Sequence, residues 1–271
     1  MIGGVYEEAA PPAELRDVAR CVWRSASEGP KRIVPDGCVD LVVGDGVAFV
    51  AGPDTAAWCA ETEGVLHGVR FVPGRAAAVL GVAADELRDR RVPVSELWGR
   101  SSAERLAEGV LSPVSAVAGR LAELPVADPA VAELIARLEA GVGRVGDAAG
   151  GLVRPGAAVP GGAGAGRGSA VAARAEDPAL SGAVSERRLR RRFVQAVGYG
   201  PATYLRVSRF RRAVALAPHV GGLAALAAAA GYADQAHLSR ECRALTGLTP
   251  GRYFRPLSTV DVAVRDRLRS A

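Results

Sequence analysis

SERRLRRRFVQAVGYGPATY (residues 185–204) and DQAHLSRECRALTGLTPGRY (residues 234–253) are two versions of one pattern, offset by 49 residues. In this register the residues that shape each segment coincide: Leu189 with Leu238, Arg191 with Arg240, Gly198 with Gly247, Pro201 with Pro250 and Tyr204 with Tyr253. A duplicated supersecondary unit accounts for so many coincidences better than chance does. The sequence therefore predicts one helical unit that is used twice.

Each copy carries the signals of a helix that follows a sharp turn. Gly182 and Gly231 permit the turn, and Ser185 and Asp234 are side chains that cap helix N-termini. Apolar residues then recur at helical spacing in both copies: Leu189, Phe193 and Val197, then Leu238, Cys242 and Leu245. A glycine and a proline end each helix. The pattern predicts two helix–turn–helix units, with a support helix over residues 223–230 and a connecting helix over residues 204–217.

The faces opposite these apolar stripes are predicted to contact DNA. The residues on them are Arg187, Arg190, Arg191 and Val194 in the first copy, and Gln235, Ala236, His237, Ser239, Arg240 and Arg243 in the second. Arginine forms paired hydrogen bonds with guanine and with phosphate, so it suits a helix that enters a major groove. One charged stripe alone is usually a solvated helix face, but two at matching positions favour DNA contact. In the connecting helix, Arg206, Arg209 and Arg212 are expected to contact backbone phosphates.

The charge of the chain is divided between its halves. The formal net charge is +5, but residues 1–140 sum to −7 and residues 141–271 to +12. Such a division is typical of a basic module that binds a polyanion and is joined to something else. We expect the acidic half to lie away from the duplex.

Composition predicts where the chain divides. Residues 141–168 contain 11 glycines and few large apolar side chains, so they cannot offset their ordering entropy and are predicted to form a linker. The expected domains are residues 1–140 for sensing or dimerisation, a linker over 141–170, and a DNA-binding domain over 171–271.

The N-terminal half is predicted to be β-rich and then helical, which makes the chain an α+β protein. Two strand patterns flank Gly44-Asp45-Gly46, a hairpin signal, and residues 64–72 form a third strand candidate. A short helix is expected over residues 75–81. Helical stripes follow in three groups: Leu106, Val110 and Leu111; Val117, Leu121 and Leu124; Val131, Leu134, Ile135 and Leu138.

The C-terminal stretch 171–256 resembles the DNA-binding domain of AraC/XylS-type transcription regulators. The phrases SERRLRRRF, GYGPATYLRVSRFRRA and GYADQAHLSRECRALTGLTPGRY carry the resemblance. It implies a bacterial-type, sequence-specific regulator of promoter DNA that works with RNA polymerase. By position it assigns DNA contacts to Arg187, Arg190 and Arg191, and to Gln235, Ala236, His237, Ser239 and Arg240. Cys242 stands where the family usually has phenylalanine, which predicts a slightly underfilled core.

The N-terminal half resembles the sensor domains that precede such DNA-binding modules. The phrases are PDGCVDL (residues 35–41), AGPD (51–54), GVRFVPG (68–74) and VSELWG (94–99). The resemblance implies a small cupin-like β domain followed by helices, a small-molecule effector and a homodimer.

A metal- or thiol-sensing, or an enzymatic, N-terminal domain anchored to DNA by the C-terminal domain is the alternative. Cys21, Cys38 and Cys59, with His67, are its candidate residues, but no CxxC-type pair is present, so buried structural cysteines are favoured. Asp36 and Asp40 are better explained as turn residues or helix caps than as paired catalytic carboxylates. Trp23, Trp58, Trp98 and Phe71 could line an apolar pocket, although core packing is the default role of such residues.

Motifs for catalysis and export do not occur in the sequence. GxSxG, HExxH and P-loop spacings are all missing, so we expect no enzymatic activity, no cofactor and no metal. The N-terminus lacks the pattern of a signal peptide, and the alanine-rich stretch 213–230 is too broken to span a bilayer. We therefore expect a cytoplasmic protein that does not bind membranes.

Overall fold

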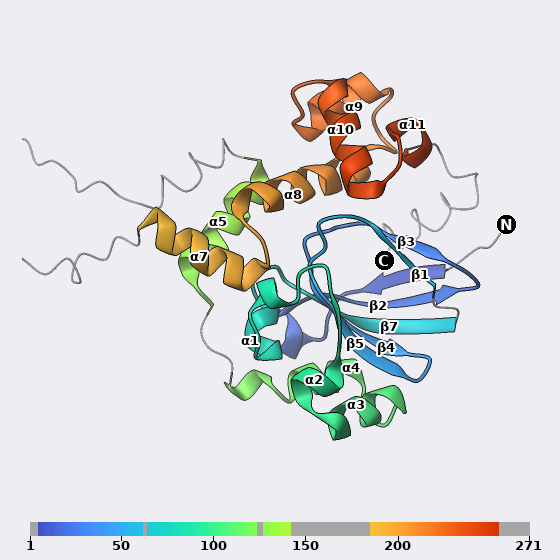
Figure 1. Ribbon diagram of the computed structural model, residues 1–271, viewed down its shortest axis with the longest axis vertical. Helices are drawn as coiled ribbons and strands as arrows, with labels where there is room; N and C mark the ends of the chain where they lie inside the picture. Colours follow the sequence, from blue (N-terminus) through green and yellow to red (C-terminus); the bar gives the residue numbers. More distant parts are fainter. Residues whose placement is uncertain (1–4, 62–63, 124–126, 142–184, 255–271) are drawn as a thin grey trace, which may run out of the picture.

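The computed structural model describes residues 5–61, 64–123, 127–141 and 185–254 (Figure 1). Six antiparallel strands form one sheet, and two short strands form another beside it. In spatial order the strands of the large sheet are β1 (Val5–Ala9), β2 (Ala19–Ser27), β7 (Gly64–Phe71), β4 (Asp40–Gly44), β5 (Val47–Ala51) and β8 (Arg91–Pro93). The small sheet pairs β3 (Lys31–Ile33) with β6 (Trp58–Ala60). With the helices that follow, the chain is an α+β protein, as the sequence predicts.

The hairpin predicted at Gly44-Asp45-Gly46 is confirmed as the turn between β4 and β5. Asp45 and Gly46 both have positive φ, of 52° and 72°, so the turn uses the left-handed backbone that aspartate and glycine tolerate best. The strand expected over residues 64–72 is β7, and the helix expected over 75–81 is α1 (Ala76–Leu80).

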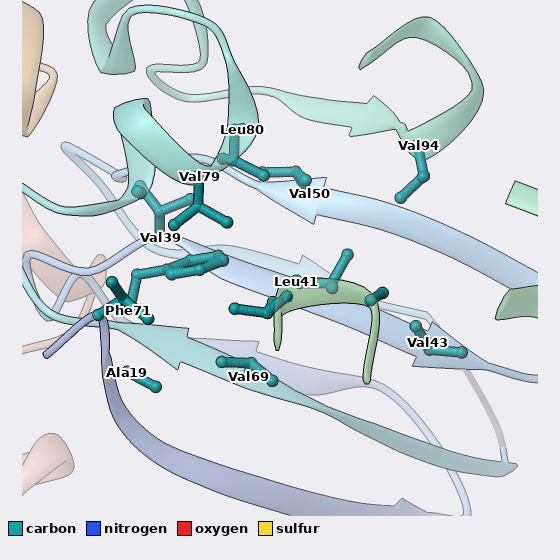
Figure 2. Packing of buried hydrophobic residues seen from close by; sticks show 14 of the residues in the cluster. Ala19, Val39, Leu41, Val43, Val50, Val69, Phe71, Val79, Leu80 and Val94 are labelled. Atoms are coloured by element: carbon teal, nitrogen blue, oxygen red, sulfur yellow. The ribbon is translucent and has the colours of Figure 1, made fainter. Parts of the chain in front are cut away.

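One face of the large sheet and a group of short helices enclose the N-terminal core (Figure 2). Leu41, Val50 and Phe71 point from the strands toward Val79 and Leu80 of α1, and all five side chains are buried. The other covering elements are η1 (Ala13–Leu15), α2 (Val94–Trp98), α3 (Arg100–Ala107) and α4 (Pro113–Ala118). The core is thus built by alternate strand positions, as expected of a sheet covered on one face.

Val110 was wrongly predicted to share a buried stripe with Leu106. Leu106 is fully buried, whereas Val110 is 66% exposed. The reason is that α3 ends at Ala107 and Gly109 takes φ 72°, so the helical period does not continue to Val110. Leu124 lies outside the described residues.

The C-terminal part is helical. Its elements are α7 (Glu186–Val197), α8 (Pro201–Leu216), α9 (Leu223–Ala230), α10 (Gln235–Thr246) and α11 (Pro250–Tyr253). The support helix expected over residues 223–230 is α9, and the connecting helix α8 begins three residues earlier than predicted, at Pro201. Within the described part of the chain, no helix is long and apolar enough to cross a membrane.

Helix α5 (Pro129–Ala140) packs with the C-terminal helices, although the predicted domain division places it in residues 1–140. Its buried side chains, Val131, Leu134, Ile135 and Leu138, share one hydrophobic cluster with α7 and α8. The predicted linker begins directly after α5, and from residue 142 it lies outside the described residues. Helices before and after that segment therefore form a single core.

Candidate nucleic-acid interface

Helices α7 and α10 carry the predicted DNA-contacting faces and are called the recognition helices below. Both begin and end as the sequence predicts. Ser185 Oγ accepts a hydrogen bond from the backbone N–H of Arg188, at 3.3 Å, and so caps α7. Asp234 Oδ1 accepts one from His237 N–H, at 2.6 Å, and caps α10. Gly198 and Gly247 end the two helices with φ 99° and 73°, a backbone conformation that costs glycine little. Gly182 lies outside the described residues.

The apolar stripes predicted for the two helices are buried, which fixes the direction of the opposite faces. Leu189, Phe193 and Val197 of α7 pack with α5 and α8, and Phe193 meets Tyr204 edge-on at a centroid distance of 5.8 Å. In the second copy Leu238, Cys242 and Leu245 are fully buried. Cys242 is enclosed there with Thr246, and its Sγ lies 3.4 Å from the carbonyl oxygen of Leu248.

Most of the predicted base-contacting side chains lie on the surface. The exposed ones are Arg187, Arg190, Arg191, Gln235, Ala236, Arg240 and Arg243. Val194, His237 and Ser239 are half-buried. The His237 ring packs edge-on against Tyr232 at 5.1 Å, and the Ser239 hydroxyl donates to the backbone carbonyl of Gln235.

The three arginines predicted to contact phosphates make contacts within the protein that the sequence did not suggest. Arg206 pairs with Glu241 of α10, and the Arg209 guanidinium lies 5.5 Å from the centre of the Tyr232 ring. Arg212 donates to the Glu139 carbonyl at the end of α5, at 2.6 Å. These side chains tie α8 to its neighbouring helices, so they orient the recognition helices whether or not they also contact DNA.

Polar contacts also fasten α5 to the C-terminal helices. Asp128, which caps α5, forms an ion pair with Arg192 of α7. At the other end, Glu139 Oε1 accepts hydrogen bonds from the Tyr204 hydroxyl at 2.8 Å and from Arg211 at 3.1 Å. The sequence does not indicate these contacts, because both carboxylates precede the glycine-rich stretch that composition predicts to separate the domains.

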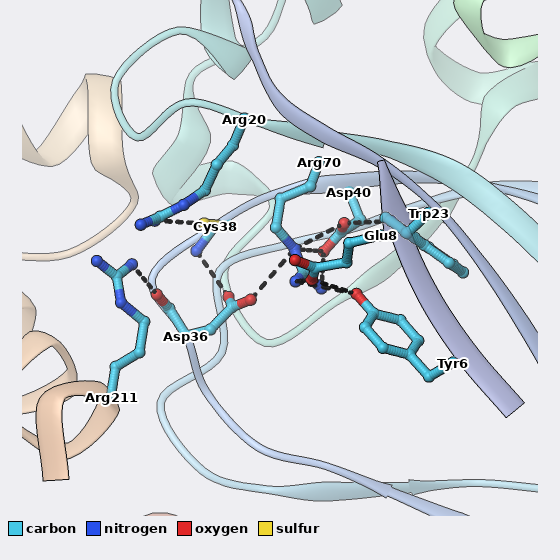
Figure 3. Close-up of polar contacts among 9 residues, drawn as sticks. All are labelled: Tyr6, Glu8, Arg20, Trp23, Asp36, Cys38, Asp40, Arg70 and Arg211. Carbon is cyan, nitrogen blue, oxygen red and sulfur yellow. Dashed lines mark hydrogen bonds and ion pairs between the residues drawn. The ribbon is translucent and has the colours of Figure 1, made fainter. Parts of the chain in front are cut away.

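A second polar group lies on the face of the large sheet that points away from the N-terminal core (Figure 3). Arg70 lies at its centre, 3.0 Å from Glu8, 3.2 Å from Asp36 and 3.1 Å from Asp40. Burial raises the pKa of Asp40 to about 6, against the opposing attraction of Arg70. No pattern in the sequence links these side chains, because three separate strands and a loop bring them together.

This polar group reaches the DNA-binding part through Asp36. The Asp36 side chain accepts a hydrogen bond from Cys38 N–H at 2.9 Å, so the turn role predicted for Asp36 is confirmed. Its backbone carbonyl accepts a hydrogen bond from Arg211 of α8 at 3.1 Å. Asp40, by contrast, lies in β4 and accepts a hydrogen bond from the Trp23 indole N–H at 2.8 Å. The N-terminal and C-terminal parts are therefore in direct contact.

The candidate metal and pocket residues of the N-terminal half do not converge. Among the described residues, no group of three or more His, Cys, Asp and Glu side chains could hold a metal ion. Cys21 and Cys38 are buried, but Cys59 was wrongly expected to be, because it lies on the exposed side of the two-stranded sheet. The four predicted aromatic residues are also dispersed: Phe71 is in the core, Trp23 binds Asp40, and Trp58 and Trp98 lie under Arg91 and Arg120.

Comparison with known proteins agrees with this geometry. Residues 181–256 match a family model described as a helix-turn-helix domain, and residues 7–93 match one described as a domain of unknown function (DUF6597). No curated protein and no solved structure matches the chain. The first match, together with the two capped helices and their exposed arginines, defines a DNA-binding helix–turn–helix protein. It supports a transcription regulator of the AraC/XylS type, and the match over residues 7–93 is consistent with a sensor-like domain before the helix–turn–helix pair.

Proposed function

We propose that the chain binds promoter DNA sequence-specifically through α7 and α10, and that a small molecule bound by its N-terminal domain adjusts this binding. The observation that carries the DNA part is the pair of exposed arginine stripes on two capped helices joined by α8. A helix of 16 residues is about 24 Å long. Adding about 5 Å, the radius of a helix, at either end approaches the distance of about 34 Å between successive major-groove segments.

Single arginine variants test DNA binding. We expect Arg240→Ala to weaken binding to a duplex selected from a random pool by roughly 5- to 150-fold, the usual loss for a base contact. Arg105→Ala is the matched control, because Arg105 is an exposed arginine in α3, remote from either stripe. Fluorescence anisotropy measures both affinities. Equal affinities for the two variants would remove Arg240 from the DNA interface.

The effector part of the proposal is supported by the polar face around Arg70. Tyr6 and Trp23 lie beside it, with ring centroids 6.2 Å apart. A small molecule bound there could therefore contact carboxylates and aromatic rings at once. A molecule that binds the folded state raises the melting temperature. We expect a metabolite library to contain a compound that raises the Tm of the wild-type protein but not that of Tyr6→Ala. A homodimer and a contact with RNA polymerase remain predictions from the resemblance.

A further inference from the structure

The N-terminal domain packs against the first recognition helix. Helix α7 lies beside α1 (Figure 1) and also packs against η2 (Ala84–Glu86). At Gly198, directly after α7, a Cβ atom would lie 2.3 Å from Pro53 Cγ and 2.9 Å from the Ala84 carbonyl oxygen. The backbone at Gly198 thus lies so close to Pro53 and Ala84 that only glycine fits at this position.

Asp85 of η2 faces the predicted DNA-contacting stripe of α7. An open surface pocket of about 500 Å³ is lined by Asp85, Gln195 and the stripe residues Arg187, Arg190, Arg191 and Val194. Asp85 Oδ1 is buried and has no hydrogen-bond partner in the described part of the chain. The Asp85 carboxylate lines the same pocket as three arginines of α7, so charge favours this arrangement of the two elements. The acidic half therefore lies along the edge of the α7 side that was predicted to face DNA, while Arg187, Arg190 and Arg191 themselves are exposed.

Two further contacts hold the parts together, and they leave the second recognition helix open. Ala57 N–H donates to the Leu245 carbonyl at 2.7 Å, and Arg32 Nη1 donates to the Thr246 carbonyl at 3.0 Å. Both acceptors belong to the C-terminal end of α10. The side chains of Arg240 and Arg243 remain exposed. The stripe arginines of both helices are therefore exposed, and the difference is that α1 and η2 pack against α7.

The dimensions of DNA make the contact with α7 incompatible with groove binding. An α-helix with its side chains is about 10–12 Å across, and the major groove is about 12 Å wide. A recognition helix therefore fills the groove, with a wall of phosphates on each flank. The N-terminal elements that pack against α7, η2 and α1 on its flank and Pro53 at Gly198, take the place of one wall.

We propose that the structure shows a docked form in which η2 and Pro53 of the N-terminal domain occlude the first recognition helix, so that only α10 is free to read DNA. This inference rests on the proposed function, because it assumes that α7 enters a major groove. The docked surface is an intramolecular competitor of duplex DNA. In the undocked form both helices contact successive groove segments.

Reversing one charge in η2 tests the docked form. Asp85→Arg places a fourth cation in the pocket and is expected to undock the domain. Glu86→Arg is the matched control, because it makes the same charge change at the next, exposed residue of η2. The apparent Kd is the intrinsic Kd divided by the competent fraction, so a mostly docked chain gains about fivefold or more in affinity when opened. Hydroxyl-radical footprinting of Asp85→Arg should add one groove segment, about 10 bp away, to the wild-type footprint.

A reversible crosslink gives a second test that does not depend on undocking. Asp85→Cys and Gln195→Cys, in a Cys59→Ser background, are joined by a reducible bismaleimide. Cys21, Cys38 and Cys242 are buried, and burial raises the pKa of each of their thiols, so they react slowly. The crosslinked protein should protect one groove segment, and the reduced protein should bind as the uncrosslinked protein does.

The outcomes separate this inference from the proposed function. If Asp85→Arg binds DNA more tightly and protects a longer footprint than Glu86→Arg, occlusion is supported. Identical affinities and footprints for these two variants, or a crosslinked protein that protects both segments, would overturn it while leaving DNA binding intact. If no form of the protein binds any selected duplex, the proposed function itself fails.

Discussion

The Tyr204 hydroxyl donates a hydrogen bond of 2.8 Å to Oε1 of Glu139, and this bond joins α8 to α5 across the glycine-rich segment. Burial raises the pKa of Tyr204, so the hydroxyl keeps its proton over the whole physiological range. The same carboxylate also accepts a hydrogen bond from Arg211. Helix α5 therefore belongs structurally to the DNA-binding part, and the orientation of α8 depends on it.

We expect Glu139→Ala to lower the free energy of unfolding by about 1–3 kcal/mol, because it leaves the Tyr204 hydroxyl and one Arg211 donor without their acceptor. Glu133→Ala on the same helix is the control. Glu133 pairs with Arg137 one turn further along the helix, on the surface, and its loss should change stability by less than about 0.5 kcal/mol. Urea unfolding measures both. Equal losses would show that α5 is not anchored through Glu139.

The polar group around Arg70, which includes Asp40, should make the free energy of unfolding depend on pH. The folded-state pKa of Asp40 is about 6, above the ordinary value of about 3.9, so folding takes up a proton between these values. The free energy of unfolding should therefore fall as pH rises from about 4 to about 6 through this group. Asp40→Asn should remove that part of the slope, and Asp45→Asn, at an exposed turn, should not. Parallel pH profiles for wild type and Asp40→Asn would contradict the assignment.

The site of Cys242 tests whether the second unit has an underfilled core. Cys242 is fully buried, and Phe210, Tyr253 and Phe254 already form an aromatic group in the same region. We therefore expect Cys242→Phe to lower the free energy of unfolding by about 1–3 kcal/mol through overpacking. Thermal melting of the variant against wild type checks this. A higher Tm would support the unfilled space inferred from the family pattern.

The docked form predicts unequal and coupled effects of the two arginine stripes. In the wild-type background Arg191→Ala should reduce DNA affinity much less than Arg240→Ala, because α7 is occluded and α10 is not. In the Asp85→Arg background both substitutions should cost about 1–3 kcal/mol of binding free energy. A double-mutant cycle between residues 85 and 191 measures the coupling. Additive effects of these two substitutions would contradict the docked form.

Local patterns predicted the helices of the DNA-binding part well, because their caps and apolar stripes are set by neighbouring residues. Ser185, Asp234, Gly198 and Gly247 all have the predicted roles. Strands β1, β2 and β8 were missed, since most of their residues are at least partly exposed and give little alternation.

Contacts between distant segments could not be predicted from local sequence. Arg70 gathers Glu8, Asp36 and Asp40 only because β7 pairs with both β2 and β4. In the same way, Asp85 and Arg190 line one pocket only because of how two domains pack, and no periodicity encodes that. The expectation that the acidic half lies away from the duplex concerns a DNA-bound state. In the structure described here that half lies against α7.

Selection of binding sites from a random pool of duplex DNA by the full-length protein tests the central claim most directly. Sequence-specific reading by α10 predicts that one common base sequence is enriched at moderate salt, and that Arg240→Ala loses the preference at one position within it. Affinity for that sequence should fall steeply as salt rises. A pool that emerges without a common sequence, or the same enrichment for Arg240→Ala, would contradict direct reading of bases by this helix.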